Sequence, residues 1–177
     1  YFDSLFAETD SVVRRWPEGN WAPFLVAISP GDSAQYDSQV LATVRRAIAV
    51  WEDAGVGLHF TLTADTTGAG IVIRGIGQLD GARAGLTDLL WAHDGAIQAA
   101  AVLLARRDSK GRPISDAGRL AVAVHEIGHA LGLPHSPNPE DVMFAATRTS
   151  RLSQRDRATV SLLYELLLGT VREPRAP

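Results

Sequence analysis

The stretch from His125 to His135 constrains the chain more than any other; it reads HEIGHALGLPH. Residues four apart on an α-helix project from the same face, about 6 Å apart along the axis, so His125 and His129 can face one point. Gly132 permits the left-handed backbone that ends a helix, and Pro134 keeps the helix from resuming. The chain can therefore turn back and bring His135 to the same point.

Three histidines that share one point can hold a zinc ion tetrahedrally and leave the fourth position for water. Glu126 is rotated by about 100° around the helix from His125, so it can reach that water without being a ligand. This arrangement predicts hydrolysis with Glu126 as general base, and a peptide as substrate. The apolar residues at 120–124 indicate a buried helix, where unpaired His and Glu would be costly.

The bulk composition limits the alternatives. The chain has 177 residues, a length typical of one domain, and a net charge of −3. Charges of both signs are interspersed, which argues against a nucleic-acid partner. The absence of cysteine excludes disulfides, thiolate ligands and a thiol nucleophile. No stretch approaches the roughly 18 apolar residues of a membrane span.

Apolar periodicity predicts a chain of strands and helices without internal repeats. Ser153 and Asp156 have capping-box spacing at the start of the last helix, and Gly55 suits the end of the first. Residues 135–150 lack a period and are expected to form a loop. We expect strands at 24–28, 56–62, 71–73, 83–91 and 97–105, and helices at 37–54, at 115–131 and from Ser153 onward.

The extended histidine pattern resembles the signature of metzincin zinc metalloproteases, which continues into a Met-turn. Met143, eight residues past His135, resembles the Met-turn methionine that forms an apolar floor beneath the zinc in that family. Ser136 follows the third histidine, and Ala145 stands where related groups carry a tyrosine; both favour the matrixin branch, the matrix-metalloprotease-like peptidase M10 type. Residues 152–156 also resemble the start of the matrixin C-terminal helix.

The resemblance implies an α+β fold: a twisted, mixed five-stranded sheet with two long helices, an active-site helix, a Met-turn loop and a C-terminal helix. Residues 16–169 would form the catalytic domain, with an N-terminal extension at 1–15 and a tail at 170–177. The implied activity is that of a zinc metalloendopeptidase on peptides or proteins, with Glu126 as general base and acid. The implied protein is secreted and monomeric, without a membrane span.

The resemblance also implies roles for residues outside the histidine motif. Asp156 would brace the Met-turn from beneath, while Arg155 departs from the family pattern, in which two adjacent Asp are usual. The mature N-terminus would thereby lack its usual acidic partner. Structural support of the site is expected from Gly132, Met143 and Asp156. Substrate is expected to contact an edge strand at Gly85, Leu86, Thr87 and Asp88, and a pocket wall running from Phe144 and Ala145 to Arg148.

Metal content and activity leave alternatives open. Once the three ligands are assigned, only His59 and His93 remain, so we expect one catalytic zinc and no second, structural zinc. Structural calcium is common in the family but is not assigned to residues here. The same fold could instead be a metal-binding or protein-interaction module that has lost proteolysis. A different zinc hydrolase, with Glu140 or Glu165 as third ligand, is a further alternative.

Overall fold

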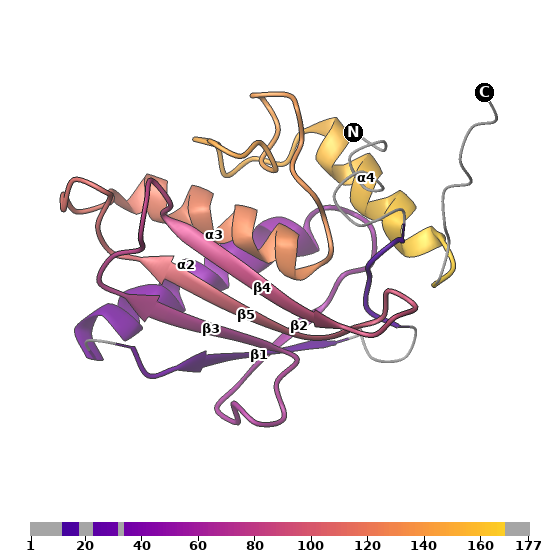
Figure 1. Ribbon diagram of the computed structural model, residues 1–177, viewed down its shortest axis with the longest axis horizontal. Coiled ribbons are helices and arrows are strands. Elements are labelled where there is room, and N and C mark those ends of the chain that lie inside the picture. Colours follow the sequence, from indigo (N-terminus) through magenta and orange to yellow (C-terminus); the bar gives the residue numbers. More distant parts are fainter. Residues whose placement is uncertain (1–11, 18–22, 32–33, 169–177) are drawn as a thin grey trace.

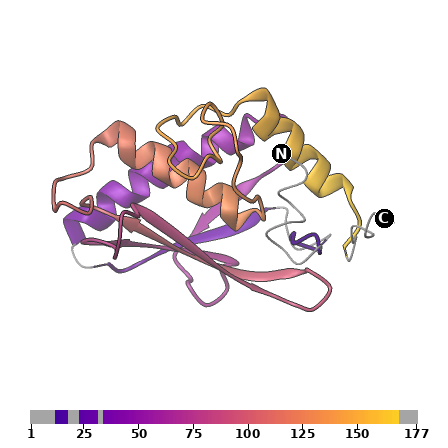
Figure 2. The ribbon, with the colours of Figure 1, turned by 45° about the horizontal axis from the view of Figure 1, so that its top comes forward.

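A five-stranded sheet with helices against one face dominates the structure, a computed structural model that describes residues 12–17, 23–31 and 34–168. Helices α2 and α3 cover the same face, and α4 lies at one end of this helical layer (Figures 1 and 2). The expected α+β class and helix arrangement are confirmed. In chain order the elements are β1 (Phe24–Ser29), α2 (Ala34–Glu52), β2 (Phe60–Thr63), β3 (Ile71–Ile76), β4 (Gly85–Trp91), β5 (Ile97–Ala105), α3 (Asp116–Ala130) and α4 (Gln154–Glu165).

The sheet is mixed, as expected, with strand order β2-β1-β3-β5-β4. Four strands run parallel, and β4 pairs antiparallel with β5 at one edge. The strand expected at 56–62 begins only at Phe60, so that prediction was wrong in its first half. Gly55 and Gly57 have positive φ angles of 80° and 75°, which extended strand backbone does not allow. The other outer strand, β4, leaves one edge without a partner strand.

The core lies between the sheet and the two long helices. Helix α2 packs over β1 and β3, and α3 packs over β4 and β5. A Cβ on Gly75 in β3 would lie 2.7 Å from Val40 and 2.8 Å from the Tyr36 ring, so glycine allows α2 to approach the sheet closely. One face of α2 is buried, and its residues recur at i, i+4, i+8 and i+11, the spacing of an amphipathic helix: Val40, Val44, Ile48 and Trp51.

Aromatic side chains from distant segments satisfy the end of α3. The last carbonyls of a helix have no partner within the helix. Trp16 Nε1 donates to the carbonyl of Ala130 at 2.8 Å, and the Tyr164 hydroxyl donates to that of Leu131 at 3.0 Å. The segment before Trp16 also packs here, since a Cβ on Gly132 would lie against the Arg14 carbonyl oxygen. The domain bounds stay a prediction, because residues 1–11 and 169–177 lie outside the described residues.

Gly128 yields a test of the packing beneath α3. A Cβ at Gly128 would lie 2.9 Å from Trp51 Cζ2 and even closer to the Met143 sulfur. Alanine favours helix over glycine by about 1 kcal/mol, but overpacking costs about 1–3 kcal/mol. We expect Gly128→Ala to lower the free energy of unfolding in urea by up to about 2 kcal/mol, the overpacking cost less the gain in helix propensity. In a Met143→Ala background the penalty should fall by at least half; an unchanged penalty would show that Met143 is not the obstacle.

Candidate active site and metal centre

The end of α3 turns the chain back toward its own helix. The N–H of Gly132 donates to the His129 carbonyl at 2.8 Å, and that of Leu133 donates to the Gly128 carbonyl at 3.0 Å. These two bonds form a Schellman motif, whose turning residue needs a positive φ; Gly132 has φ +99°. This local motif returns the chain to the face of α3 that carries His125 and His129.

The three histidines meet at one point. His129 Nε2 lies 3.1 Å from His125 Nε2 and 3.2 Å from His135 Nε2. The ligand atoms of the three side chains all lie within 4.8 Å of one another. Nitrogens bound to a tetrahedral zinc at about 2.0–2.1 Å would lie about 3.3 Å apart. The histidine set therefore fits one zinc ion.

The hydrogen bonds of the rings identify which nitrogens can bind metal. His125 Nδ1 lies 2.8 Å from the Val142 carbonyl oxygen, and His129 Nδ1 lies 2.8 Å from that of Leu133. Carbonyl oxygens only accept, so each Nδ1 carries the proton and each Nε2 presents a lone pair. Lone pairs facing one another at this distance repel unless a cation lies between them. The backbone thus prepares these imidazoles as ligands.

The surroundings of His125 and His129 favour the neutral form of both rings. Burial lowers the pKa of His125 below its ordinary value. His129 is partly open to the cleft, yet the protein packed around its ring lowers its pKa to about 3. Metal binding requires neutral imidazole. At neutral pH, His125 and His129 therefore do not have to release a proton before a metal can bind.

Glu126 is buried beside the histidines and contacts β4. The Thr87 hydroxyl lies 2.7 Å from Glu126 Oε2 and 3.1 Å from the Glu126 carbonyl oxygen. Without a bound cation, burial raises the pKa of Glu126 to about 7, against the hydrogen bond from Thr87, which lowers it. A cation at the histidines would favour the carboxylate. A Cβ on Gly85 would lie 2.5 Å from Glu126 Cγ, so glycine leaves room for this side chain.

A cleft of about 800 Å³ contains these groups. Its lining includes Glu126 and the three histidines, and also Gly85, Leu86, Thr87 and Ala145 among the residues expected to contact substrate. Phe144, expected beside Ala145, is not among the lining residues; it pairs with Ser136 in a short β-bridge. The contact between Thr87 and Glu126 was missed from sequence, because no spacing signals a contact across 39 positions.

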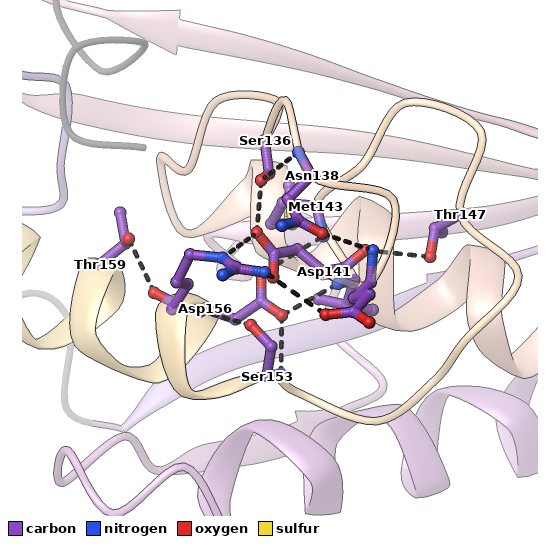
Figure 3. A network of polar contacts seen from close by, with 11 residues as sticks. Ser136, Asn138, Asp141, Met143, Thr147, Ser153, Asp156 and Thr159 are labelled. Atoms are coloured by element: carbon purple, nitrogen blue, oxygen red, sulfur yellow. Dashed lines mark hydrogen bonds and ion pairs between the residues drawn. The ribbon is translucent and has the colours of Figure 1, made fainter.

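The Met-turn is held by the first turn of α4. Met143 is fully buried, with its sulfur against Gly128 of α3. Asp156 accepts hydrogen bonds from the N–H of Val142 at 2.9 Å, of Met143 at 3.4 Å and of Ser153 at 2.8 Å (Figure 3). Ser153 Oγ accepts from the Asp156 N–H in return, which completes the predicted capping box. Asp156 thus links the start of α4 to the Met-turn.

A second carboxylate, Asp141, ties the same loop to α4 (Figure 3). Its side chain is buried and accepts hydrogen bonds from Ser136 Oγ and from Arg155 Nε, the latter at 3.1 Å. Burial works to raise the pKa of Asp141, but the hydrogen bonds from Arg155 and Ser136 outweigh it and hold that pKa below its ordinary value. Arg155, noted in the sequence as a departure from the family pattern, is therefore the ion-pair partner of the Met-turn.

The depressed pKa of Asp141 predicts how its contribution depends on pH. A carboxyl whose folded pKa is lowered stabilises the fold above its ordinary value of 3.8, and this contribution disappears as pH falls through the folded pKa. We expect Asp141→Asn to lower the free energy of unfolding by about 1–2 kcal/mol at pH 7, since Arg155 is half exposed and its pairing is screened. The difference in the free energy of unfolding between this variant and the wild type should become smaller below about pH 4.

Glu140→Gln is the matched control, because Glu140 is 85% exposed and lies 3.9 Å from the same arginine. The free energies of unfolding of the wild type and of both variants are measured in urea from acidic to neutral pH. A chelator is present throughout, so that release of a metal does not contribute to the pH dependence. A gap between wild type and Asp141→Asn that does not change with pH would contradict the assignment. An equal loss in Glu140→Gln would also contradict it.

Comparison with known proteins agrees with this geometry. The family model of the matrixin peptidases, Peptidase M10, matches residues 24–165. Macrophage metalloelastase of Rattus norvegicus is 48% identical over 48 residues, 24% of this chain and 10% of that protein. The 72 kDa type IV collagenase of Gallus gallus is 46% identical over 48 residues, 25% of this chain and 7% of that protein. The family model covers most of the chain, which therefore belongs to the matrixin family of metallopeptidases.

Proposed function

We propose that this matrixin domain is a zinc-dependent endopeptidase, with His125, His129 and His135 as ligands and Glu126 as general base. The observation that carries the proposal is the meeting of imidazole lone pairs beside a buried carboxylate in one cleft. The matched relatives are far longer than the matched stretch, so their activities and substrates come to this chain only as part of the proposal.

The roles follow from the chemistry of each group. Bound zinc supplies Lewis-acid chemistry: it polarises the scissile carbonyl and makes water acidic enough to react near neutral pH. Glu126 takes the proton of the attacking water and passes it to the leaving amine. The Thr87 hydroxyl holds Glu126 Oε2 and so leaves Oε1 to exchange that proton. Burial of Glu126 keeps bulk water away from this transfer.

The substrate peptide would lie extended along β4. This strand is at the sheet edge, and its residues Gly85, Leu86 and Thr87 line the cleft. An extended peptide can add to such an edge through main-chain hydrogen bonds. These bonds contribute affinity that does not depend on the peptide sequence. Ala145 and the residues after it would form the opposite wall. Three residues outside the ligand set would support the geometry of the proposed site: Gly132, Met143 and Asp156.

The remaining expectations stay part of the proposal: one zinc, no second structural zinc, unassigned calcium, a monomer and an extracellular location. Helices in the described ranges are too short or too polar to cross a membrane. The competing reading is a binding module with a purely structural zinc. Structural zinc usually has four protein ligands and no use for a buried carboxylate beside it. Glu126 therefore discriminates between the two functions.

Glu126→Gln tests the proposed chemistry directly. The change preserves the side-chain shape but removes the proton acceptor, so we expect peptide cleavage to fall by at least about 100-fold. Zinc stoichiometry, measured by elemental analysis, should remain one per chain. Cleavage at the wild-type rate in this variant would refute the role of Glu126.

The ligand set needs its own comparison. His135→Ala should lose zinc and activity together, whereas Glu140→Ala should keep both, since Glu140 is 85% exposed and absent from the cleft lining. Zinc loss in Glu140→Ala with zinc kept in His135→Ala would instead support the hydrolase in which Glu140 is the third ligand.

Thr87→Val removes the hydroxyl that orients Glu126 while nearly preserving shape. We expect kcat to fall about tenfold, because a charge-assisted hydrogen bond is lost, with KM little changed. Thr87→Ser keeps the hydroxyl and should restore most of kcat. Steady-state kinetics on one peptide checks all three proteins; a serine variant as slow as the valine variant would mean that the methyl group matters instead.

A further inference from the structure

Three arginines from separate segments line the proposed substrate cleft: Arg14, Arg83 and Arg148. Glu126 is the one carboxylate among the described lining residues. The chain as a whole carries a net charge of −3, so this positive charge is a local property of the cleft. Clefts lined by one sign of charge concentrate ligands of the opposite sign.

Arg148 belongs to the loop after the Met-turn, which lines the cleft together with β4, and this loop is held in place. The Thr147 N–H donates to the Phe144 carbonyl at 2.9 Å, and the Thr147 hydroxyl lies 3.4 Å from the Asp141 carbonyl oxygen (Figure 3). Arg148 itself is exposed, and within the described ranges its guanidinium makes no hydrogen bond or ion pair. A positioned loop thus presents an uncompensated positive charge to the cleft.

The other two arginines flank β4. Arg83 is exposed and precedes the strand by two residues; its Nε lies 3.4 Å from the Asp80 carbonyl oxygen, which does not neutralise it. Arg14 lies over the Trp91 ring at the far end of β4, 3.9 Å from the ring centre. A cation–π contact fixes a guanidinium but leaves its charge intact. A peptide along β4 would therefore meet a cation near each end and another from the opposite wall.

We infer that the cleft selects peptides carrying carboxylates on both sides of the bond to be cleaved. The inference rests on the proposed peptidase function and names its substrate class as acidic peptides. Guanidinium groups pair with carboxylates through two parallel N–H bonds, so each arginine can recognise an Asp or Glu side chain. A C-terminal carboxylate has the same chemistry and could occupy one of these positions.

The test uses peptides that differ only in Glu against Gln on either side of the cleaved bond, each with a free or an amidated C-terminus. Binding to the zinc-loaded Glu126→Gln variant is measured by calorimetry, and kcat/KM is measured with the wild-type protein. For each Glu that pairs with an exposed arginine, we expect the affinity and kcat/KM to be about fivefold higher than for the Gln peptide. This difference should shrink as the salt concentration rises. An effect of amidation alone, with Glu and Gln peptides bound equally, would refute the recognition of side-chain carboxylates and assign the arginines to a terminal carboxylate.

Charge reversal assigns the preference to particular residues. Each of two variants, Arg148→Glu and Arg83→Glu, should weaken the preference for Glu peptides. Each should also improve binding of peptides that carry Lys where the preferred peptides carry Glu. Arg151→Glu is the matched control: it makes the same charge change three residues from Arg148, at an exposed position outside the cleft lining, and should leave the preference unchanged. Unfolding curves check that all three variants fold.

Equal binding of Glu and Gln peptides would overturn the inference, as would an Arg151→Glu effect as large as that of Arg148→Glu. Cleavage without any charge preference would refute this inference and leave the peptidase function standing. Tighter binding of acidic peptides with no peptide cleaved would refute the peptidase function and leave the carboxylate site standing.

Discussion

The carboxylate of Asp156 is the interaction on which the rest of the site depends. It is fully buried and accepts backbone hydrogen bonds from the Met-turn and from the start of α4 at once. Each of these N–H groups would be costly to bury without a partner. The carboxylate also lies in the first turn of a helix, where the helix dipole favours negative charge. One side chain therefore caps α4 and determines the path of residues 142–143.

From the Met-turn, the constraint reaches the three clustered histidines through backbone atoms. The Val142 carbonyl oxygen orients His125, and the Met143 carbonyl oxygen accepts from the N–H of Ser136, the neighbour of His135. His129 is oriented instead by the Schellman turn of its own helix. Rigid backbone partners of this kind prepare the imidazoles before metal binds, so little ordering remains to oppose binding.

Neighbouring residues of α4 act on the same loop with opposite charges. Asp156 binds its backbone, while Arg155 pairs with the buried Asp141 carboxylate. A positive side chain is unfavourable in the first turn of a helix, where Arg155 lies. The ion pair of Arg155 with Asp141 accounts for an arginine at this position. Together the two residues hold the loop that carries Met143, packed against Gly128, and Arg148, in the lining of the cleft. The histidine cluster and the lining of the cleft thus share one support.

The local features could be predicted from the order of the residues alone: two histidines on one helix face, the glycine turn that returns a third, and the capping box of the last helix. These depend on helix geometry and backbone dihedral limits, which act over a few residues. The contact of Thr87 with Glu126 and the ion pair of Asp141 with Arg155 became visible only in the folded chain. Contacts between distant residues depend on how strands and helices stack, and no spacing along the chain encodes that.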